Sequence, residues 1–358
     1  MSLDILITVL LLQTQYSLSG NWQDAAFYHS IACRTVCALG YHISVLPDYD
    51  ATAPSLEQRR SCHGRMLFWL CYTSDKDLAL HTGVPPLLID EFCDLSLPQD
   101  CPSTIDLPSL ITSSDHDETD HVYAMPPLPR DIRLGQIKER ICRLLYSPRA
   151  FKDFDSQILL NIRHLDDQIE HWRLSLPSPQ RPALMSSSFS NLVGSRAKDM
   201  RYAYQHLEYL YLMVVVHMAV RRFRVTSTDI SDIAEDRHRL IHSSVDISLE
   251  ASRSIFGCLK AMINALSEEA FWPVVRYATP AAITLVLNML VHPLNEQGQH
   301  DLELLISVSN LIRCMTTSTL APSEVACIKD TNSFVMELVF LGTCAMRKAG
   351  REEEDHGT

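Results

Sequence analysis

Cysteine and histidine are the residue types in this 358-residue chain that could bind a metal ion or act as nucleophile and base. The sequence holds 11 cysteines and 15 histidines. Cys33 and Cys37 are four residues apart in an apolar segment, the other cysteines are scattered, and the Cys-x2-Cys spacing of common zinc sites does not occur. We therefore expect reduced, buried cysteines that bind neither a metal nor a cofactor.

Two histidines stand in an acidic run that could in principle hold a metal ion. The run covers residues 115–121 and places His116 and His121 beside aspartates. Because the surrounding segment is rich in proline and has no fixed scaffold, we interpret the run as a solvent-exposed charged loop. His42 has no other metal ligand near it in the sequence, and we predict a capping or packing role for it.

Common catalytic motifs are absent from the sequence. It has no glycine-rich phosphate loop, no Gly-x-Ser-x-Gly, no His-Glu-x-x-His and no dinucleotide fingerprint. We expect a protein that is not an enzyme and has no catalytic residues. Ser/His/Asp groups meet only in space, so a small-molecule-binding or catalytic protein on a helical scaffold stays open as the alternative. Its ligand-binding residues are unknown; four tyrosines could line an apolar pocket, although core packing is favoured: Tyr202, Tyr204, Tyr209 and Tyr211.

The charge balance argues against direct DNA recognition. The formal net charge is −12, whereas a free-standing nucleic-acid binder carries a basic face. The main basic run holds Arg221, Arg222 and Arg224 at the end of an apolar segment. It could be a nucleic-acid or nuclear-import patch, but contact with the carbonyl groups at a helix C-terminus is favoured.

The apolar N-terminus could be mistaken for a targeting segment. Ile5–Leu12 has the length of a signal-peptide core, but Asp4 precedes it and no basic region or clean cleavage site accompanies it. It is too short to span a bilayer. We predict a buried helix.

Apolar spacing is helical along the chain, and only 11 residues are glycine, which favours an all-α protein with antiparallel helical hairpins. The first hairpin is predicted from Leu3–Ser17 and Trp22–Tyr41, with Ser19-Gly20-Asn21 as the turn and Gly40 as the stop. Further helices are predicted at residues 132–145, 154–174, 201–220, 241–266, 280–291, 302–315 and 333–347.

We expect two helical halves joined by a linker. The N-terminal half covers residues 1–98, and an acidic, proline-rich linker covers residues 99–130. The C-terminal half covers residues 131–348, and residues 349–358 form an acidic tail that composition predicts to be disordered.

The stretch from Glu57 to Pro98 is the most patterned part of the chain. Its first part is helical by apolar spacing and contains Phe68 and Trp69. Gly83 and Pro85 then stop the helix, because glycine permits a turn and proline removes an N–H group. The pattern predicts a helix whose rigid turn holds an acidic loop against a helical core, with Trp69 buried.

This stretch resembles the signature of the fungal-specific transcription factor domain, the middle homology region of fungal zinc-cluster regulators. The matching elements are an acidic residue, paired arginines, an aromatic helix, a Gly-x-Pro turn, an acidic loop and a proline. They are Glu57, Arg59, Arg60, Phe68, Trp69, Tyr72, Asp75, Gly83, Pro85, Asp90, Asp94 and Pro98. Lys76 departs from the pattern, since the family usually has arginine there, which is a mild change for a surface charge and a larger one for a bidentate pair.

A second match lies far along the chain, in Tyr146-Ser147, Leu165-Asp166, Trp172-Arg173 and Leu176-Pro177. The resemblance implies a nuclear regulator of transcription, acting on a fungal metabolic or secondary-metabolite gene set. It also implies transcriptional machinery or a zinc-cluster protein as partner and a small-molecule effector, with DNA contacted only indirectly and no membrane. The family's six-cysteine zinc cluster is absent from this sequence, so we expect a domain of a longer regulator, a domain working through a partner, or a repurposed fold such as an adaptor.

Overall fold

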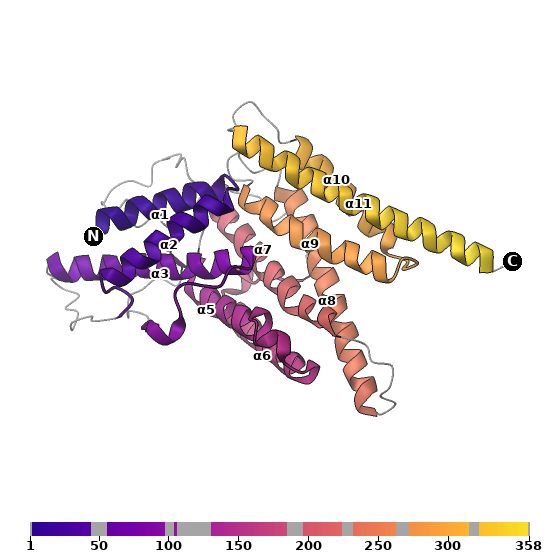
Figure 1. The fold of residues 1–358 in the computed structure, drawn as a ribbon, viewed down its shortest axis with the longest axis horizontal. Coiled ribbons are helices and arrows are strands. Elements are labelled where there is room, and N and C mark those ends of the chain that lie inside the picture. The colour runs from indigo at the N-terminus through magenta and orange to yellow at the C-terminus, as the bar shows by residue number, and fades with distance from the viewer. Residues whose placement is uncertain are drawn as a thin grey trace. The chain divides into compact units, whose positions relative to one another are not determined.

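The computed structural model of the protein is all-α, as the sequence predicts (Figure 1). It describes residues 2–43, 56–96, 104–105, 130–184, 196–223, 232–262, 272–314 and 322–356. Within these residues the β-structure is one antiparallel pair, β1 (Thr104–Ile105) with β2 (Arg130–Asp131). The chain divides into two compact units, Met1–Phe151 and Lys152–Thr358, which are described separately below.

Unit 1 is built on a helical hairpin and a long central helix. Its helices are α1 (Leu3–Leu18), α2 (Trp22–Ala38), α3 (Leu56–Thr82) and α5 (Ile132–Ile141). Short turns are η1 (Asp90–Phe92), the π-helical η2 (Cys142–Tyr146) and, at the boundary with unit 2, η3 (Ala150–Lys152). Helix α3 packs against α1, α2 and α5.

Unit 2 holds the remaining described helices. They are α6 (Asp155–Ser175), α7 (Arg196–Met218), α8 (Asp232–Met262), α9 (Trp272–Val291), α10 (Gly298–Cys314) and α11 (Pro322–His356), with the short turns η4 (Ser178–Gln180) and η6 (Ala219–Arg222). Helix α7 packs against α6, α8 and α9, and α11 packs against α9 and α10. As its apolar sequence predicts, α7 is buried on nearly all sides where its side chains are described.

The α1–α2 hairpin follows the sequence prediction closely. Gly20 takes a positive φ of 72° in the turn, a conformation that costs glycine little. The side chain of Asn21 then caps α2 by accepting from the backbone N–H of Asp24 at 3.2 Å. Leu6 and Leu10 of α1 are fully buried, which confirms a core helix at the N-terminus.

The division of the chain differs from the expected one. The first unit runs to Phe151 rather than ending at residue 98, because α5 returns to pack on α3. Gly135 of α5 lies so close that a Cβ atom there would meet the Thr73 methyl group at 3.1 Å. The acidic run 115–121 and most of the expected linker lie outside the described residues.

Five helices of unit 2, α7 to α11, begin before their predicted starts, and the differences are largest in α8, α9 and α11. Helix α9 begins at Trp272 and contains Pro280, the residue at which its start is predicted. Helix α8 begins at Asp232, and α11 runs from Pro322 to His356. Residues 349–356, expected to be disordered, thus continue a helix, to which the Lys348–Glu352 pair at 3.8 Å contributes.

No helix among the described residues has both the length and the apolar character that a membrane span requires.

Candidate functional site

Helix α3 carries an aromatic cluster in the centre of unit 1. Phe68, Trp69 and Tyr72 are each fully buried, which confirms the predicted position of Trp69. The Trp69 ring lies 5.3 Å from that of Phe68 and 5.4 Å from that of Tyr72, both in edge-to-face geometry. This cluster faces the core that α1 and α2 also line.

The predicted turn after α3 is present. Gly83 has a φ of 72°, and its N–H donates to the Ala79 carbonyl at 2.9 Å. A Cβ atom at Gly83 would meet nothing within 4 Å, so the left-handed backbone alone accounts for glycine here. Pro85 follows in the extended segment that leads residues 86–96 back along α3.

Asp75 holds that returning segment against the helix. Its carboxylate accepts from the backbone N–H groups of Leu87 and Leu88, each at 2.9 Å. It also accepts from the Lys76 ammonium group at 3.2 Å and contacts His29 Nε2 at 3.2 Å. The Asp75 side chain is only 3% exposed, and one carboxylate therefore joins α2, α3 and the loop. Buried charges persist when they are paired in this way.

Lys76 is the second charged group in this core, and its side chain is fully buried. The ammonium group donates to the Leu88 carbonyl and lies 4.7 Å from the centre of the Tyr72 ring. The Tyr72 hydroxyl donates to Asp90 at 2.8 Å. Lys76 is therefore an enclosed charge and not a surface one, so its difference from the family's arginine lies in the packed core.

Arg65 fixes the far end of the loop, a role that is not predicted from the sequence. Its guanidinium group donates to the carbonyls of Tyr41, at 3.0 Å, and of Asp94 and Ser96. It also lies over the Phe68 ring, 4.4 Å from the ring centre. Arginine suits this position because its planar group offers five donors in a fixed geometry. The sequence signal was its place one helical turn before Phe68 and Trp69.

His42 contributes through its backbone. Its carbonyl accepts from the Asp94 N–H at 2.8 Å, and the Asp94 carboxylate in turn accepts from the Ser96 N–H at 2.8 Å. We define the signature network as Arg65, Tyr72, Asp75 and Lys76 together with the groups of residues 87–96 that they bind, which are backbone groups and the Asp90 carboxylate. Asp90 and Asp94, predicted as an acidic loop, are thus fixed to α3.

The environment sets the protonation of this network. Burial alone would raise the pKa of Asp75, but the His29 contact, the Lys76 charge and the Leu87 N–H outweigh burial and lower it below its ordinary value. Burial, together with the Asp90 carboxylate, raises the pKa of the Tyr72 hydroxyl far above its ordinary value. At neutral pH the network therefore holds an ionised Asp75 and a protonated Tyr72.

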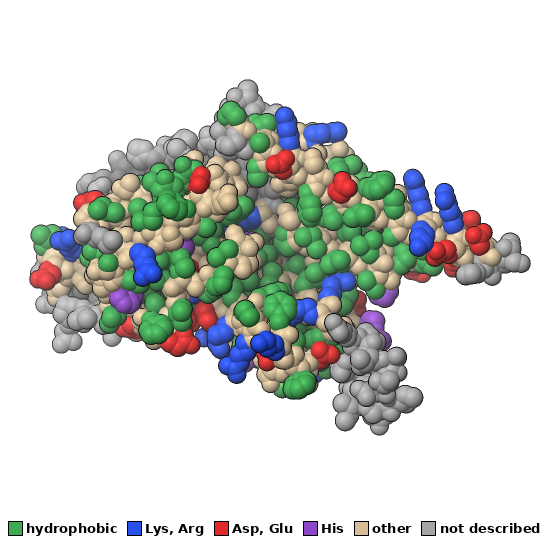
Figure 2. Space-filling model, viewed as in Figure 1, with side chains coloured by type: hydrophobic (Ala, Val, Ile, Leu, Met, Phe, Trp, Pro, Cys, Tyr) green, Lys and Arg blue, Asp and Glu red, His purple; other side chains and the backbone are tan. Residues whose placement is uncertain are grey.

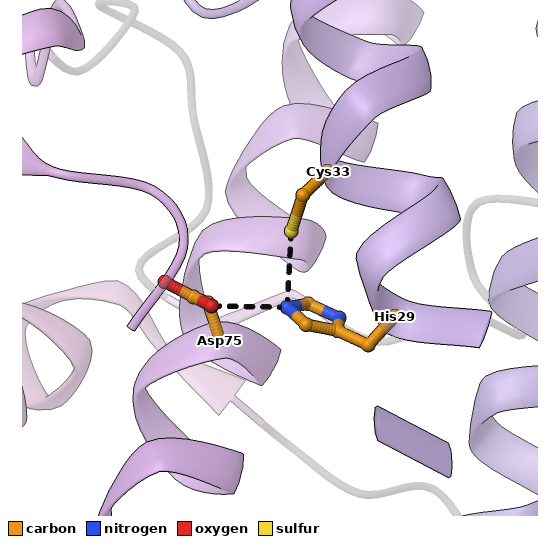
Figure 3. Close-up of side chains that lie close together, drawn as sticks. All are labelled: His29, Cys33 and Asp75. Carbon is orange, nitrogen blue, oxygen red and sulfur yellow. Dashed lines mark hydrogen bonds and ion pairs between the residues drawn. The ribbon is translucent and has the colours of Figure 1, made fainter. Parts of the chain in front are cut away.

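His29, Cys33 and Asp75 form the cluster in unit 1 most like a reactive or metal-binding group (Figure 3). Cys33 Sγ lies 3.1 Å and Asp75 Oδ1 lies 3.2 Å from the same atom, His29 Nε2. A nucleophile–base–acid relay requires the thiol and the carboxylate on opposite ring nitrogens. Here His29 Nδ1 is buried without a hydrogen-bond partner in the described part of the chain. The geometry does not match a relay.

The same cluster is poorly suited to a cation. Asp75 already accepts from two backbone N–H groups, and the Lys76 ammonium lies 3.2 Å from its second oxygen. Burial raises the pKa of the Cys33 thiol well above its ordinary value, whereas a metal requires the thiolate. We interpret the cluster as a hydrogen-bonded polar core.

The remaining signature residues do not join this network. Arg59 and Arg60 are exposed in the first turns of α3, as is Glu57. Pro98 lies outside the described residues. The signature thus combines buried residues that fix the loop with surface residues at the start of the helix.

Unit 2 buries polar groups of its own. Tyr277 and Arg276 of α9 both contact Glu208 of α7, and Arg253 pairs with the buried Asp301 at 2.7 Å. Three of the four tyrosines considered as pocket residues are buried core residues: Tyr204, Tyr209 and Tyr211. The fourth, Tyr202, accepts from Gln180 at 2.9 Å.

Two further features of unit 2 bear on ligands. Arg222 donates to the Ala219 carbonyl at 3.3 Å, which confirms the helix-end role for that arginine; Arg224 lies outside the described residues. An open cleft of about 810 Å³ is lined by apolar and acidic side chains and by Arg253. Its lining includes Leu184, Asp246, Ile247, Leu249, Glu250 and Leu294.

Comparison with known proteins finds one matching family and two similar transcription factors. Residues 1–174 match the fungal specific transcription factor domain. An "ABC-transporter-regulating transcription factor" of Aspergillus fumigatus is 23% identical over 317 residues, and one of Aspergillus oryzae is 24% identical over 324 residues. The matches cover 88% of this chain but 34% of each relative, so the chain spans about a third of their length. No solved structure matches.

Proposed function

We propose that this chain, whose residues 1–174 belong to the fungal specific transcription factor domain family, is the regulatory part of a fungal transcription regulator. The two Aspergillus relatives both bear the name of a transcription factor. The observation that carries the proposal is the signature network, because the family match and the buried contacts fall on the same segment of the chain.

The burial of that network supports a regulatory rather than a catalytic role. The side chains of Asp75 and Lys76 are at most 3% exposed, so no substrate reaches them. Their donors and acceptors meet groups of the chain itself. A buried network of this kind defines one arrangement of helix and loop, which a regulatory domain requires.

We propose that DNA is contacted only indirectly, through a zinc-cluster protein. The net charge of −12 opposes attraction to phosphate. Arg222 is engaged with its own helix end. The expected places of action are the nucleus and the promoters of its target genes, with transcriptional machinery as a further partner.

The target genes follow from two sources. The sequence resemblance suggests a metabolic or secondary-metabolite gene set, and the names of both relatives refer to regulation of an ABC transporter. We propose both classes as targets, and transcript sequencing of a deletion strain would separate them. For a small-molecule effector we propose the cleft beside Arg253, where apolar and acidic groups meet.

A tethering experiment tests the regulatory role. The full chain would be fused to a heterologous DNA-binding domain in a fungal reporter strain, and reporter expression compared with that of the DNA-binding domain alone. We expect a clear change in expression. An unchanged reporter, with fusion protein present in the nucleus, would contradict the proposal.

Matched variants connect the result to the signature network. Asp75→Asn should abolish the reporter effect, because it removes a buried charge on which the loop depends. Glu57→Gln removes an exposed carboxylate from the same helix and should retain the effect. Footprinting of the unfused chain on promoter fragments at physiological salt should show no protected sequence.

A further inference from the structure

Two histidines face each other on the surface of α8. His238 and His242 are both exposed and stand four residues apart, so they lie on neighbouring turns of the same side of the helix. Their ring centroids are 4.2 Å apart, with 58° between the ring planes, and their Nε2 atoms are 3.1 Å apart. Figure 2 shows that histidine side chains reach the surface of unit 2. The two imidazoles thus bring the same ring nitrogen to one point.

The separation of these two nitrogens matches that of a metal chelate. An imidazole nitrogen binds zinc at about 2.0–2.1 Å. Two such nitrogens on one ion, at a ligand–metal–ligand angle between about 90° and 109°, lie about 2.8–3.4 Å apart. The observed 3.1 Å falls within that range. An ion can therefore bind both rings with little movement of either side chain.

A hydrogen bond between the two rings would also bring these nitrogens together. It needs a proton on one Nε2 and a lone pair on the other, whereas an ion needs lone pairs on both, with each ring protonated at Nδ1. The two states exclude each other, so a bound ion replaces the hydrogen bond. Because both rings already stand in the chelating position, the ion binds without first ordering two free side chains.

The histidine pair supplies two ligands and leaves the other positions of the ion to water. Asp246, four residues after His242, continues the same row and is exposed. Its carboxylate attracts cations to this side of the helix and offsets the charge of the neighbouring Arg239. Asp246 also lines the cleft of unit 2. A bound ion would therefore lie about one helical turn, roughly 5.4 Å along α8, from the cleft wall.

We propose that His238 and His242 form a binding site for a late first-row divalent metal ion such as Ni²⁺, Cu²⁺ or Zn²⁺, for which imidazole is a suitable ligand. No metal site at this place was predicted from the sequence, and neither the cysteines nor the acidic run 115–121 takes part in it. An ion held by both rings ties two successive turns of α8 together. The inference is independent of the proposed function in transcription.

Calorimetric titration of the full chain with Ni²⁺ tests the site, and Ni²⁺ is the probe because zinc also binds thiolates. We expect one saturable site that His238→Gln and His242→Gln each weaken about a hundredfold, since a chelate then becomes a single ligand. His171→Gln, at an exposed histidine of α6 with no histidine four residues away, is the matched control and should bind as the wild type does. A wild-type chain without a saturable site, or a site unaffected by His242→Gln, would overturn the proposal.

Exchanging two neighbouring residues tests the spacing at constant composition. His242→Ser with Ser243→His moves the second histidine to five residues from His238, off the shared side of the helix, and should remove the site. Adding His238→Arg with Arg239→His returns the separation to four residues and should restore binding. All four positions are exposed, so helical circular dichroism should stay unchanged. Binding that persists in the first variant, or fails to return in the second, would rule out the chelate.

Amide hydrogen exchange adds a measure of where the ion binds. Saturating Ni²⁺ should slow exchange in the turns of α8 around the histidine pair, because a ligand bound to the folded helix opposes its local opening. The effect should disappear in the variant with His242→Ser and Ser243→His. Exchange in these turns that Ni²⁺ leaves unchanged in the wild-type chain would place the ion elsewhere and overturn the proposal.

Discussion

Helices α3 and α11 reverse the usual distribution of residue types in opposite ways. Helix α3 buries Arg65, Asp75 and Lys76 almost completely, while α11 leaves Phe334 and Phe340 in solvent. Charges are normally outside and large apolar groups inside. A buried charge costs free energy unless it is paired, whereas a singly exposed apolar side chain costs little.

In α3 the compensation is within the chain. The charged groups bind each other and the backbone carbonyls and N–H groups of the loop. In α11 the side chains of Phe334 and Phe340 lie off the face that packs on α9 and α10 within unit 2. A buried charge must be satisfied by groups of the chain itself, whereas an exposed apolar side chain can be changed with little effect on the folded protein. The predictions below test this distinction, from the largest expected effect to the smallest.

Asp75→Asn should have the largest effect on stability. The change leaves the Lys76 ammonium buried without its counter-charge, and breaking a buried pair costs about 3–5 kcal/mol. Denaturant unfolding followed by helical circular dichroism measures the loss. Glu57→Gln on the same helix is exposed and should change the free energy of unfolding by less than about 0.5 kcal/mol. Equal effects of the two variants would show that the network is not closed to solvent.

Trp69→Ala should destabilise the protein by about 3–5 kcal/mol, because it removes a fully buried indole ring from a packed core. The matched change in α11 is Phe340→Ala, at a side chain that is 63% exposed, and it should leave the free energy of unfolding nearly unchanged. Denaturant unfolding of both variants gives the comparison. A Trp69→Ala protein that melts like the parent would contradict the observed core.

As the pH falls, unit 2 should lose folding stability first and unit 1 at lower pH. Burial lowers the pKa of His206 in α7 to about 4, while the unfolded value is about 6.5. The unfolded chain binds more protons in this window, so stability is complete above pH 6.5 and is lost as pH falls towards 4, by on the order of 3 kcal/mol. The lowered pKa of Asp75 adds a loss only at lower pH, as that carboxylate becomes protonated.

Melting temperatures measured from pH 7 to pH 4 test the His206 contribution. His206→Gln keeps a donor for the Ala183 carbonyl, which the histidine binds at 3.0 Å, and should flatten the profile. His171→Gln, at an exposed histidine of α6, should leave the profile unchanged. A profile insensitive to His206→Gln would place the acid-sensitive group elsewhere.

Much of unit 1 could be predicted from the sequence, because its signals are local. Gly20, Gly83 and Asn21 act on the residues beside them, and apolar spacing marks α1, α2 and α3. The helices α8, α9 and α11 begin before their predicted starts. The first turns of α8 are rich in charge, and in α9 Pro280 resembles a helix boundary although the residues before it are apolar. A proline inside a helix removes one backbone hydrogen bond, and tertiary packing can offset that cost. The spacing of apolar residues in the sequence does not show whether it does.

The partners within the signature network could not be predicted in the same way. Asp75 and Tyr72 belonged to the expected pattern, but His29 lies 46 residues from Asp75 in sequence, and Arg65 binds carbonyls 24 to 31 residues away. Backbone acceptors leave no trace in residue type. A charge in the middle of an apolar helix was the available signal, and Arg65, Asp75 and Lys76 all carried it.

Tyr72→Phe should have the smallest effect and gives the finest test of the network. The variant keeps the buried ring beneath Lys76 and removes only the hydroxyl that donates to Asp90 at 2.8 Å. Loss of one such hydrogen bond costs about 1 kcal/mol. The Asp90 side chain is 26% exposed, so water can replace the lost donor and keep the cost at that level. Denaturant unfolding measures the change, and a double-mutant cycle with Asp90→Asn isolates the pair. A loss near that of Asp75→Asn would mean that Tyr72 and Asp90 support the Lys76 charge, and that the network acts as one unit rather than as separate contacts.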